Sequence, residues 1–524
     1  MKMPILMQAI EGRRLDEHHG CPRVIVDHDG WRLACEALAA GRWALLGLWG
    51  DTHAVHMSVL DQPQANANKI EPNHNAHSQT DQSQSSVAVL SLDCLDGRFP
   101  SVGAVHAPAI RCERAIRSLF GLEPVGLPDP RPWLDLGFWG CTHPLGTHAE
   151  ATAPTGAYVF LPAHGEALHQ IPVGPVHAGI IEPGHFRFTA SGETVVRLEQ
   201  RLGYVHKGIE KLMAGATIDK ASRLAGRTCG DSAVAYALAF ARAVEAALDT
   251  EVPSRAAHLR ALMAELERLA NHFGDIGTIC NDASFSIMHA QCGILREQTL
   301  RVADTCFGHR LMMDCVVPGG TTFDLSAAGS KAILALTEQI KGTFPRLVEL
   351  YDNTASLQDR TAATGILPAA LARTFAAGGY VGRASGRDFD ARRRPGYAPY
   401  DELEFEVPVL TTGDVDARVW VRIREVEQSL RLIDQIVRSL PAGSILSRLD
   451  SSPGTREGFA VVEGFRGDVL AWIRIEHSRV ARCHLRDPSW FQWPLLEAAI
   501  EGNIVADFPL CNKSFNCSYS GHDL

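Results

Sequence analysis

Hydrophobic and polar residues alternate along residues 43–60 and again along 87–92, with the two-residue period of half-buried β-strands. Residues 62–86 between them are rich in Gln, Asn, Ser and His and carry almost no apolar side chains, so we expect a disordered loop. Residues 106–120 have the spacing of an amphipathic helix, and Gly121 marks its expected end. The beginning of the chain is therefore predicted to form a small α/β domain with a long hairpin connection.

A stretch rich in Pro, Gly and Trp follows this region, over residues 122–154. Such composition is typical of the exposed connections between domains. We therefore place a domain boundary there, which predicts one domain over residues 1–150 and a second over 151–524.

The apolar period beyond the boundary is mostly helical. It predicts helices over 202–213, 221–248, 253–272, 285–307, 327–351 and 419–440. Three short runs with a strand pattern follow, at 458–462, 469–475 and 479–484. A last short helix is predicted over 490–501. The predicted fold class is α+β, with the small N-terminal domain followed by a large, mainly α-helical domain that carries a small antiparallel sheet.

Composition excludes some classes of function. Hydrophobic residues make up 46% of the chain and charged residues 21%, as in ordinary globular proteins. The net charge of -10 argues against nucleic acid as a partner. No stretch reaches the roughly 18–20 apolar residues that span a bilayer. The 13 cysteines contain no C-x-x-C pair, which favours reduced thiols in the cytoplasm over a disulfide framework.

One motif carries candidate chemistry: Arg227-Thr228-Cys229-Gly230-Asp231-Ser232. If the segment is helical, Cys229 and Ser232 share one face, because residues three apart are neighbours on a helix. A thiol beside a hydroxyl is a candidate ligand or polar site. The alternative is a packing seam of small residues around a buried cysteine.

Several separated segments together resemble one superfamily. It contains the large subunits of group 4 membrane-bound nickel–iron hydrogenases, including formate hydrogenlyase, and the corresponding 49 kDa-type subunit of respiratory complex I. The segments that carry the resemblance are 174–177 with 182–183, 201–211, 265–272, 382–393 and 463–468. Residues before about 150, chiefly 99–101 and 116–121, resemble the 30 kDa-type complex I subunit, which is fused ahead of this one in formate hydrogenlyase. The resemblance implies a hydrogenase-large-subunit-like fold for the second domain.

The hydrogenase side of the resemblance implies a nickel–iron centre held by two C-x-x-C pairs, because these metals prefer thiolates. In this chain the second position of the first pair is Ser232. In the C-terminal pair, one register places Cys517 and Ser520 at the cysteine positions, and the gap-free register, which we favour, places Ser518 and Gly521 there. Both bridging positions lack sulfur in either register. We therefore expect no metal ligands, and nickel–iron is an unlikely cofactor.

The resemblance also implies roles for individual residues. Glu182 aligns with a glutamate that relays protons, although a plain loop carboxylate is the alternative. Arg466 aligns with an arginine that lines the metal pocket. Arg466 and Asp468, which lie in the same glycine-flanked turn, are the other predicted catalytic residues. The alternative for both is a structural ion pair. The predicted cofactor-binding residues are His177, Cys229, Ser232, Arg383 and Cys517. His177 aligns with a quinone-site histidine of complex I, whereas Gly230 and Ser232 replace the tyrosine and histidine that hold the quinone there.

The expected function is that of a subunit in a membrane-associated oxidoreductase complex. No cofactor is expected to bind this chain tightly. A small iron–sulfur subunit would supply electrons from its cluster, and a quinone-like molecule would accept them. Membrane subunits would translocate ions. The resemblance to complex I also implies NAD binding in the complex. The expected location is cytoplasmic, peripheral on the inner face of the cell membrane. The alternatives are an active nickel–iron hydrogenase and a non-catalytic structural coupling subunit.

Overall fold

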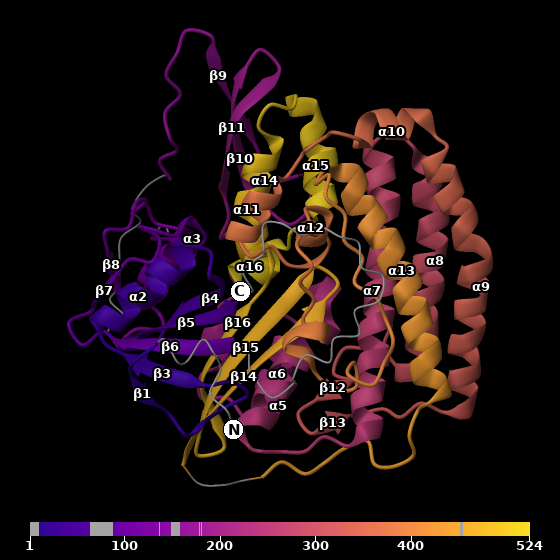
Figure 1. The fold of residues 1–524 in the computed structure, drawn as a ribbon, viewed down its shortest axis with the longest axis horizontal. Coiled ribbons are helices and arrows are strands. Elements are labelled where there is room, and N and C mark those ends of the chain that lie inside the picture. The colour runs from indigo at the N-terminus through magenta and orange to yellow at the C-terminus, as the bar shows by residue number, and fades with distance from the viewer. Residues whose placement is uncertain are drawn as a thin grey trace. The chain divides into compact units, whose positions relative to one another are not determined.

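The computed structural model describes residues 10–62, 87–135, 137–147, 158–177, 179, 181–450 and 454–524. The chain divides into two compact units, residues 1–155 and 156–524 (Figure 1). Helices and strands are both well represented, which confirms the predicted α+β class.

The first unit is built on a five-stranded sheet in the order β1-β3-β6-β5-β4. Its elements are β1 (Arg13–Arg14), β2 (His18–His19), β3 (Arg23–Val26), α2 (His28–Ala39), β4 (Trp43–Gly50), β5 (Ala54–Asp61), β6 (Val87–Asp93), β7 (Arg98–Pro100), η1 (Ala107–Ala109), α3 (Ile110–Phe120) and β8 (Glu123–Val125). β5 and β6 pair in antiparallel fashion with Leu60 opposite Val87, so the predicted long connection does join neighbouring strands. Residues 63–86 themselves lie outside the described residues. Gly121 ends α3 with a left-handed φ of 74°, as predicted.

The second unit begins with an antiparallel sheet in a region for which no element was predicted from the sequence. Its strands are β9 (Leu168–Val173), β10 (His185–Ser191) and β11 (Thr194–Arg201), in the order β11-β10-β9. Figure 1 shows the long helices of this unit side by side: α7 (Ser254–Asp282), α8 (Ser286–Phe307), α9 (Ala327–Asp352) and α13 (Val415–Arg438). These confirm the predicted helices, although α7 continues beyond its predicted end at residue 272.

A meander of three long strands lies nearer the C-terminus: β14 (Thr455–Gly464), β15 (Gly467–Glu476) and β16 (Arg479–Arg486). Helix α6 (Ala233–Ala247) packs on β14 and β15. A Cβ atom on Gly458 would overlap the carbonyl oxygen of Ala243, so glycine allows helix and sheet to approach closely here. The remaining elements are α4 (Ile209–Met213), α5 (Ile218–Ala225), η2 (Gly230–Ser232), β12 (Val316–Val317), β13 (Gly320–Thr321), α10 (Ala355–Thr361), α11 (Ala369–Thr374), α12 (Gly379–Ala384), η3 (Arg392–Gly396), α14 (Ser489–Ile500), η4 (Val505–Asp507), α15 (Phe508–Phe515) and α16 (Tyr519–Asp523).

The helix predicted over residues 202–213 was wrong in its first half. Gly203 and Gly208 adopt left-handed φ angles of 94° and 68°. The backbone N–H groups of Gly203 and Val205 donate to the Asp523 carboxylate at 2.9 and 3.0 Å, and that of Gly208 donates to the carbonyl oxygen of Leu524 at 3.0 Å. These amides bind the C-terminal tail and are not available for a helix.

The single helix predicted over residues 221–248 was also wrong. The segment forms α5, then the 3-10 turn η2, and then α6. The Glu267 carboxylate of α7 accepts hydrogen bonds from the backbone N–H groups of Val234 and Ala235, at 2.7 and 3.1 Å, and so satisfies the first turn of a new helix. Cys229 and Ser232 therefore come together through a tight turn and not on the face of a helix. Within the described residues, no helix is long and apolar enough to cross a membrane.

Candidate functional site

Three segments that are far apart in the sequence meet at Cys229. The turn η2 brings Cys229 and Ser232, the turn between β14 and β15 brings Arg466, and the C-terminal tail brings Ser518. The Ser518 hydroxyl donates to Cys229 Sγ at 3.1 Å, and Arg466 Nη1 donates to Cys229 Sγ at 3.6 Å and to Ser232 Oγ at 3.3 Å. All four residues are buried. We call these four residues the Cys229 cluster.

Arg466 is the fixed cation of this cluster. Its guanidinium forms an ion pair with Asp231, and its Nε donates to the carbonyl oxygen of Asn516 at 2.5 Å. Burial by itself would lower the pKa of Arg466, but Asp231 and Cys229 outweigh it and raise the pKa well above its usual value. The side chain thus joins η2, the β14–β15 turn and the tail through a permanent positive charge.

Cys229 carries a thiol that resists ionisation. Burial raises its pKa above the usual value, Asp231 raises it further, and Arg466 acts in the opposite direction. A neutral thiol is a weak ligand and a weak nucleophile, because the thiolate is the reactive form. The Cys229 cluster is therefore a hydrogen-bonded network of polar side chains around the protonated thiol of Cys229.

The tail places Ser518, and not Ser520, opposite Cys229. The backbone N–H of Gly521 donates to Ser518 Oγ at 2.8 Å, whereas the backbone N–H of Ser520 donates to the Glu182 carboxylate at 3.1 Å. Cys517 is buried one residue before the contacting serine. This geometry is what the gap-free register would give, but the assignment of Ser518 and Gly521 to the two cysteine positions stays a prediction.

Glu182 and His177 lie on the connection between β9 and β10. Glu182 is exposed but reaches the tail through the Ser520 amide. His177 has its Nε2 2.8 Å from the carbonyl oxygen of Gly184, and its ring lies 5.6 Å from that of Phe186. The structure therefore brings Glu182 to the C-terminal tail, next to the Cys229 cluster. His177 instead contacts the backbone of its own loop, the connection between β9 and β10.

Lys207 is a residue that the sequence argument did not single out, although it stands inside the segment 201–211. Its Nζ donates to the carbonyl oxygen of Thr228, next to Cys229, at 2.7 Å. Burial lowers the pKa of Lys207, while Glu182 and Cys229 act to raise it. A cation between the Glu182 loop and the motif at 227–232 could transfer a proton or orient an anionic group. The segment match was the available signal for it.

Arg383 and Asp468 form buried ion pairs away from Cys229. Arg383 binds Glu425 at 2.6 Å, Glu463 at 2.9 Å and Asp390 at 3.4 Å. Asp468 binds Arg486 at 2.5 Å. These contacts are those of structural ion pairs, so the cofactor-binding role of Arg383 and the catalytic role of Asp468 stay predictions.

The acidic and basic residues around Arg383 extend into one buried charge cluster. The His272 ring contacts Glu425 at 2.7 Å, and Arg392 bridges Asp390 and Glu265 at 2.7 and 2.9 Å. Burial by itself would raise the pKa of Glu425, but Arg383 outweighs it and holds the pKa well below the usual range. Among the described residues, no group of three or more His, Cys, Asp or Glu side chains is arranged to hold a metal ion.

Comparison with known proteins places the chain among redox-complex subunits. A family described as nickel-dependent hydrogenase matches residues 207–274, and one described as respiratory-chain NADH dehydrogenase, 49 kDa subunit, matches residues 285–453. Hydrogenase-4 component G of Escherichia coli K12 is 31% identical over 448 residues, which cover 83% of this chain and 78% of that protein. Formate hydrogenlyase subunit 5 of the same organism is 31% identical over 445 residues, with the same coverage.

A solved structure shares the fold. The membrane-bound sulfane sulfur reductase, described as an archaeal respiratory membrane complex, contains a chain that superposes with a TM-score of 0.64 at 25% identity. The match covers 68% of this chain and 99% of that one. The chain therefore belongs to the large-subunit family that unites nickel-dependent hydrogenases with the 49 kDa subunit of respiratory-chain NADH dehydrogenase.

Proposed function

We propose that this chain is the large subunit of a membrane-associated oxidoreductase complex in which protein side chains have replaced the nickel–iron centre. The kinship to hydrogenase and formate hydrogenlyase subunits supports the complex. The observation that carries the loss of the metal is the set of groups around the Cys229 thiol. The Ser518 hydroxyl donates to Cys229 Sγ at 3.1 Å, and Arg466 Nη1 donates to Cys229 Sγ and to the hydroxyl of Ser232, so serine hydroxyls stand where the metal centre would need thiolates.

The donor set does not suit nickel and iron. In the gap-free register, Cys229 alone of the four ligand positions has sulfur, Ser232 and Ser518 have hydroxyls, and Gly521 has no side chain; in the other register Cys517 adds one thiol, but both bridging positions still lack sulfur. Hydroxyls are neutral and hard, whereas these metals prefer thiolates. The residues present therefore do not fit a nickel–iron group.

The position of Gly521 adds a steric argument. An added Cβ would lie 2.5 Å from Asp487 Oδ2 and 2.8 Å from Tyr236 Oη. Tyr236 donates to Asp487 at 2.8 Å, so both groups are held in place. A cysteine at this position would have to displace this buried pair, which makes reconstruction of the metal site by substitution costly.

We expect the native complex to contain no stoichiometric nickel and the variant Ser232→Cys to gain none, because one new thiol leaves the tail without its bridging sulfur. Elemental analysis after chelation, with hydrogen uptake measured on the same sample, checks this. Ser222→Cys, which adds a thiol at another buried serine of the same region, is the matched control. About one nickel per chain, retained after chelation and accompanied by hydrogen uptake, would show an active hydrogenase and overturn the proposal.

The polar groups that remain suit an acceptor that takes up electrons together with protons. Lys207 and the Cys229 thiol carry exchangeable protons near the tail. We propose that an iron–sulfur subunit supplies the electrons, that a quinone-like molecule accepts them, and that membrane subunits couple the reaction to ion translocation. The chain would then lie on the cytoplasmic face of the membrane as a peripheral subunit. We also propose that the first unit corresponds to the 30 kDa-type subunit of complex I, fused ahead of the large subunit.

The test is to purify the complex with its partners, reduce it chemically and follow the oxidation of its iron–sulfur clusters by a water-soluble quinone. Quinone-dependent oxidation supports the proposed acceptor. Oxidation by a polysulfide alone would assign a sulfur acceptor, as the name of the sulfane sulfur reductase that shares the fold suggests. If neither compound oxidises the clusters of an intact complex, the chain would instead be a non-catalytic structural coupling subunit.

A further inference from the structure

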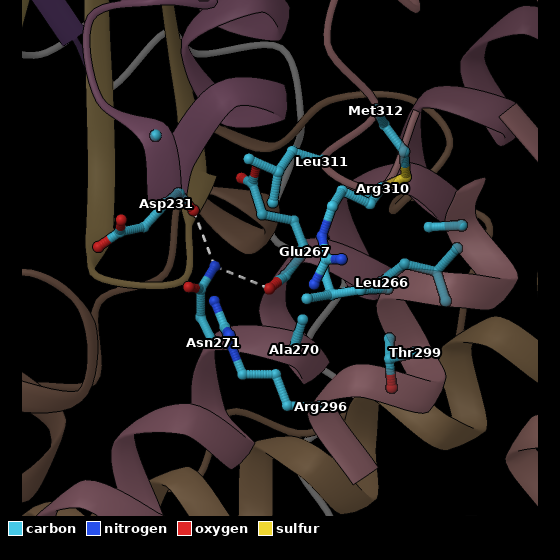
Figure 2. A pocket seen from close by; sticks show the side chains of 13 residues that line it. Asp231, Leu266, Glu267, Ala270, Asn271, Arg296, Thr299, Arg310, Leu311 and Met312 are labelled. Carbon is cyan, nitrogen blue, oxygen red and sulfur yellow. Dashed lines mark hydrogen bonds between the residues drawn. The ribbon is translucent and has the colours of Figure 1, made fainter. Parts of the chain in front are cut away.

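A cavity lies against η2, the same turn that brings Cys229 and Ser232 into the Cys229 cluster. Its volume is about 210 Å³, which is room for several water molecules. Figure 2 shows Asp231 and Asn271 on one side of it and Arg310 and Met312 on the other. The wall is formed by η2, α7, α8 and the loop that follows α8.

Glu267 is the carboxylate that connects this cavity to the cluster. Its side chain lines the cavity, and its two oxygens accept the N–H groups of Val234 and Ala235 at 2.7 and 3.1 Å. These amides follow Ser232 by two and three residues at the start of α6. Among the described residues, no Arg or Lys lies within ion-pair distance of the Glu267 carboxylate. In contrast, the buried glutamates of the charge cluster, Glu425, Glu463 and Glu265, each pair with an arginine.

The wall beside Glu267 is held rigidly. The Asn271 amide donates to the carbonyl oxygens of Asp231 and Glu267, at 2.7 and 2.9 Å, and so ties η2 to α7 (Figure 2). Asp231 pairs with Arg466 and remains 47% exposed, while Arg296 and Arg310 are exposed where α8 and its following loop line the cavity. The cavity thus has a wet, charged mouth and reaches inward to the buried Glu267 carboxyl group.

We infer that this cavity is the proton inlet of the redox site and that Glu267 is its proton carrier. The inference rests on the proposed function. A proton from bulk water protonates the Glu267 carboxylate, and the carboxylic acid then gives that proton, through cavity water, to the acceptor that has received electrons from the iron–sulfur partner. Glu267 returns to the carboxylate, so each cycle moves one proton and leaves the chain unchanged.

The charges around Glu267 suit this role. Burial raises its pKa to about 8, the amides of Val234 and Ala235 act to lower it, Asp231 raises it, and Arg268 on its own helix lowers it. Arg296 and Arg310 face the same cavity from α8 and its following loop. A group that exchanges its proton near neutral pH is suited to proton transfer under physiological conditions.

The experiment uses the intact complex and the variant Glu267→Gln, which keeps a carbonyl acceptor for one amide but cannot carry a proton. We expect electron transfer to a water-soluble quinone to fall by about 100-fold at pH 7, and the decline of the wild-type rate above about pH 8 to disappear. The matched control is Glu113→Gln. Glu113 is a buried carboxyl that also accepts two backbone amides, from Val102 and Gly103, and burial raises its pKa to about 7, but it lies in the first unit. Its variant should keep the wild-type rate and pH profile.

Two further measurements keep the inference falsifiable. Ala303→Leu fills the cavity from α8 without touching the carboxylate, and it should slow the reaction as well. Redox-triggered infrared difference spectra should show a carboxylic acid band that is absent from Glu267→Gln and changes on reduction of the iron–sulfur partner. This readout needs no acceptor, so it distinguishes failure of the inlet from failure of the proposed function. A Glu267 band that does not respond to reduction, or an unchanged rate and pH profile in Glu267→Gln, would overturn the inference.

Discussion

Replacing Arg383 with methionine is expected to lower the free energy of unfolding by about 3–5 kcal/mol, because the change leaves buried carboxylates without their cation. Glu425, Glu463 and Asp390 all contact the guanidinium and are all buried. Methionine keeps most of the side-chain volume, so the loss reports charge and not a cavity. Denaturant unfolding, followed by circular dichroism at neutral pH, measures it.

The matched control is Arg301→Met on α8. Arg301 pairs with Glu297 at 2.9 Å, but its side chain is 77% exposed, and exposed ion pairs of this spacing contribute about 0.3–0.5 kcal/mol. The two variants remove the same chemical group from different environments. If Arg383→Met unfolds with a loss no larger than that of the control, the buried charge cluster does not stabilise the fold and its residues become candidates for another role.

Replacing Gly379 with alanine is expected to destabilise the second unit by about 2–5 kcal/mol and to disturb the Cys229 cluster. Gly379 has a left-handed φ of 59°, which costs a residue with a side chain about 1–2 kcal/mol. In addition, a Cβ there would overlap the carbonyl oxygen of Arg466 and lie 2.7 Å from the amide nitrogen of Gly467, an overpacking that costs about 1–3 kcal/mol. The β14–β15 turn must move, and Arg466 moves with it.

Two measurements check this prediction. Denaturant unfolding gives the loss of stability, and mass spectrometry after brief thiol labelling gives the exposure of Cys229, which is 4% exposed in the native fold. The control is Gly396→Ala, where φ is also left-handed at 82° but no atom lies within 4 Å of the added Cβ. It should show the backbone strain alone and leave Cys229 protected. Equal effects in the two variants would contradict the argument that Gly379 positions the Arg466 turn.

Helical segments of the second unit were predictable because their apolar residues repeat with a local period. α8 (Ser286–Phe307) and α9 (Ala327–Asp352) match their predicted ranges closely, and so do the strands of the meander around β15. Such elements bury one continuous face, and the periodic sequence reports that face directly. The strands β9 to β11 were missed because no element was predicted between residues 155 and 201, although residues 185–201 carry β-branched and aromatic residues typical of strands.

The sequence by itself determined the chemical content of the site: a thiol at Cys229, a hydroxyl at Ser232, a tail that offers either Ser518 or Cys517, and the family to which these positions belong. Only the tertiary structure decided how they are used. It interrupts the predicted helices at residues 203–208 and 226–232, seats Arg466 between Cys229 and Ser232, and gives Glu267 a cavity and two amides. The physical reason is that these partners are hydrogen-bonding and charged groups separated by tens to hundreds of residues, and pairings at such a distance leave no period in the local sequence.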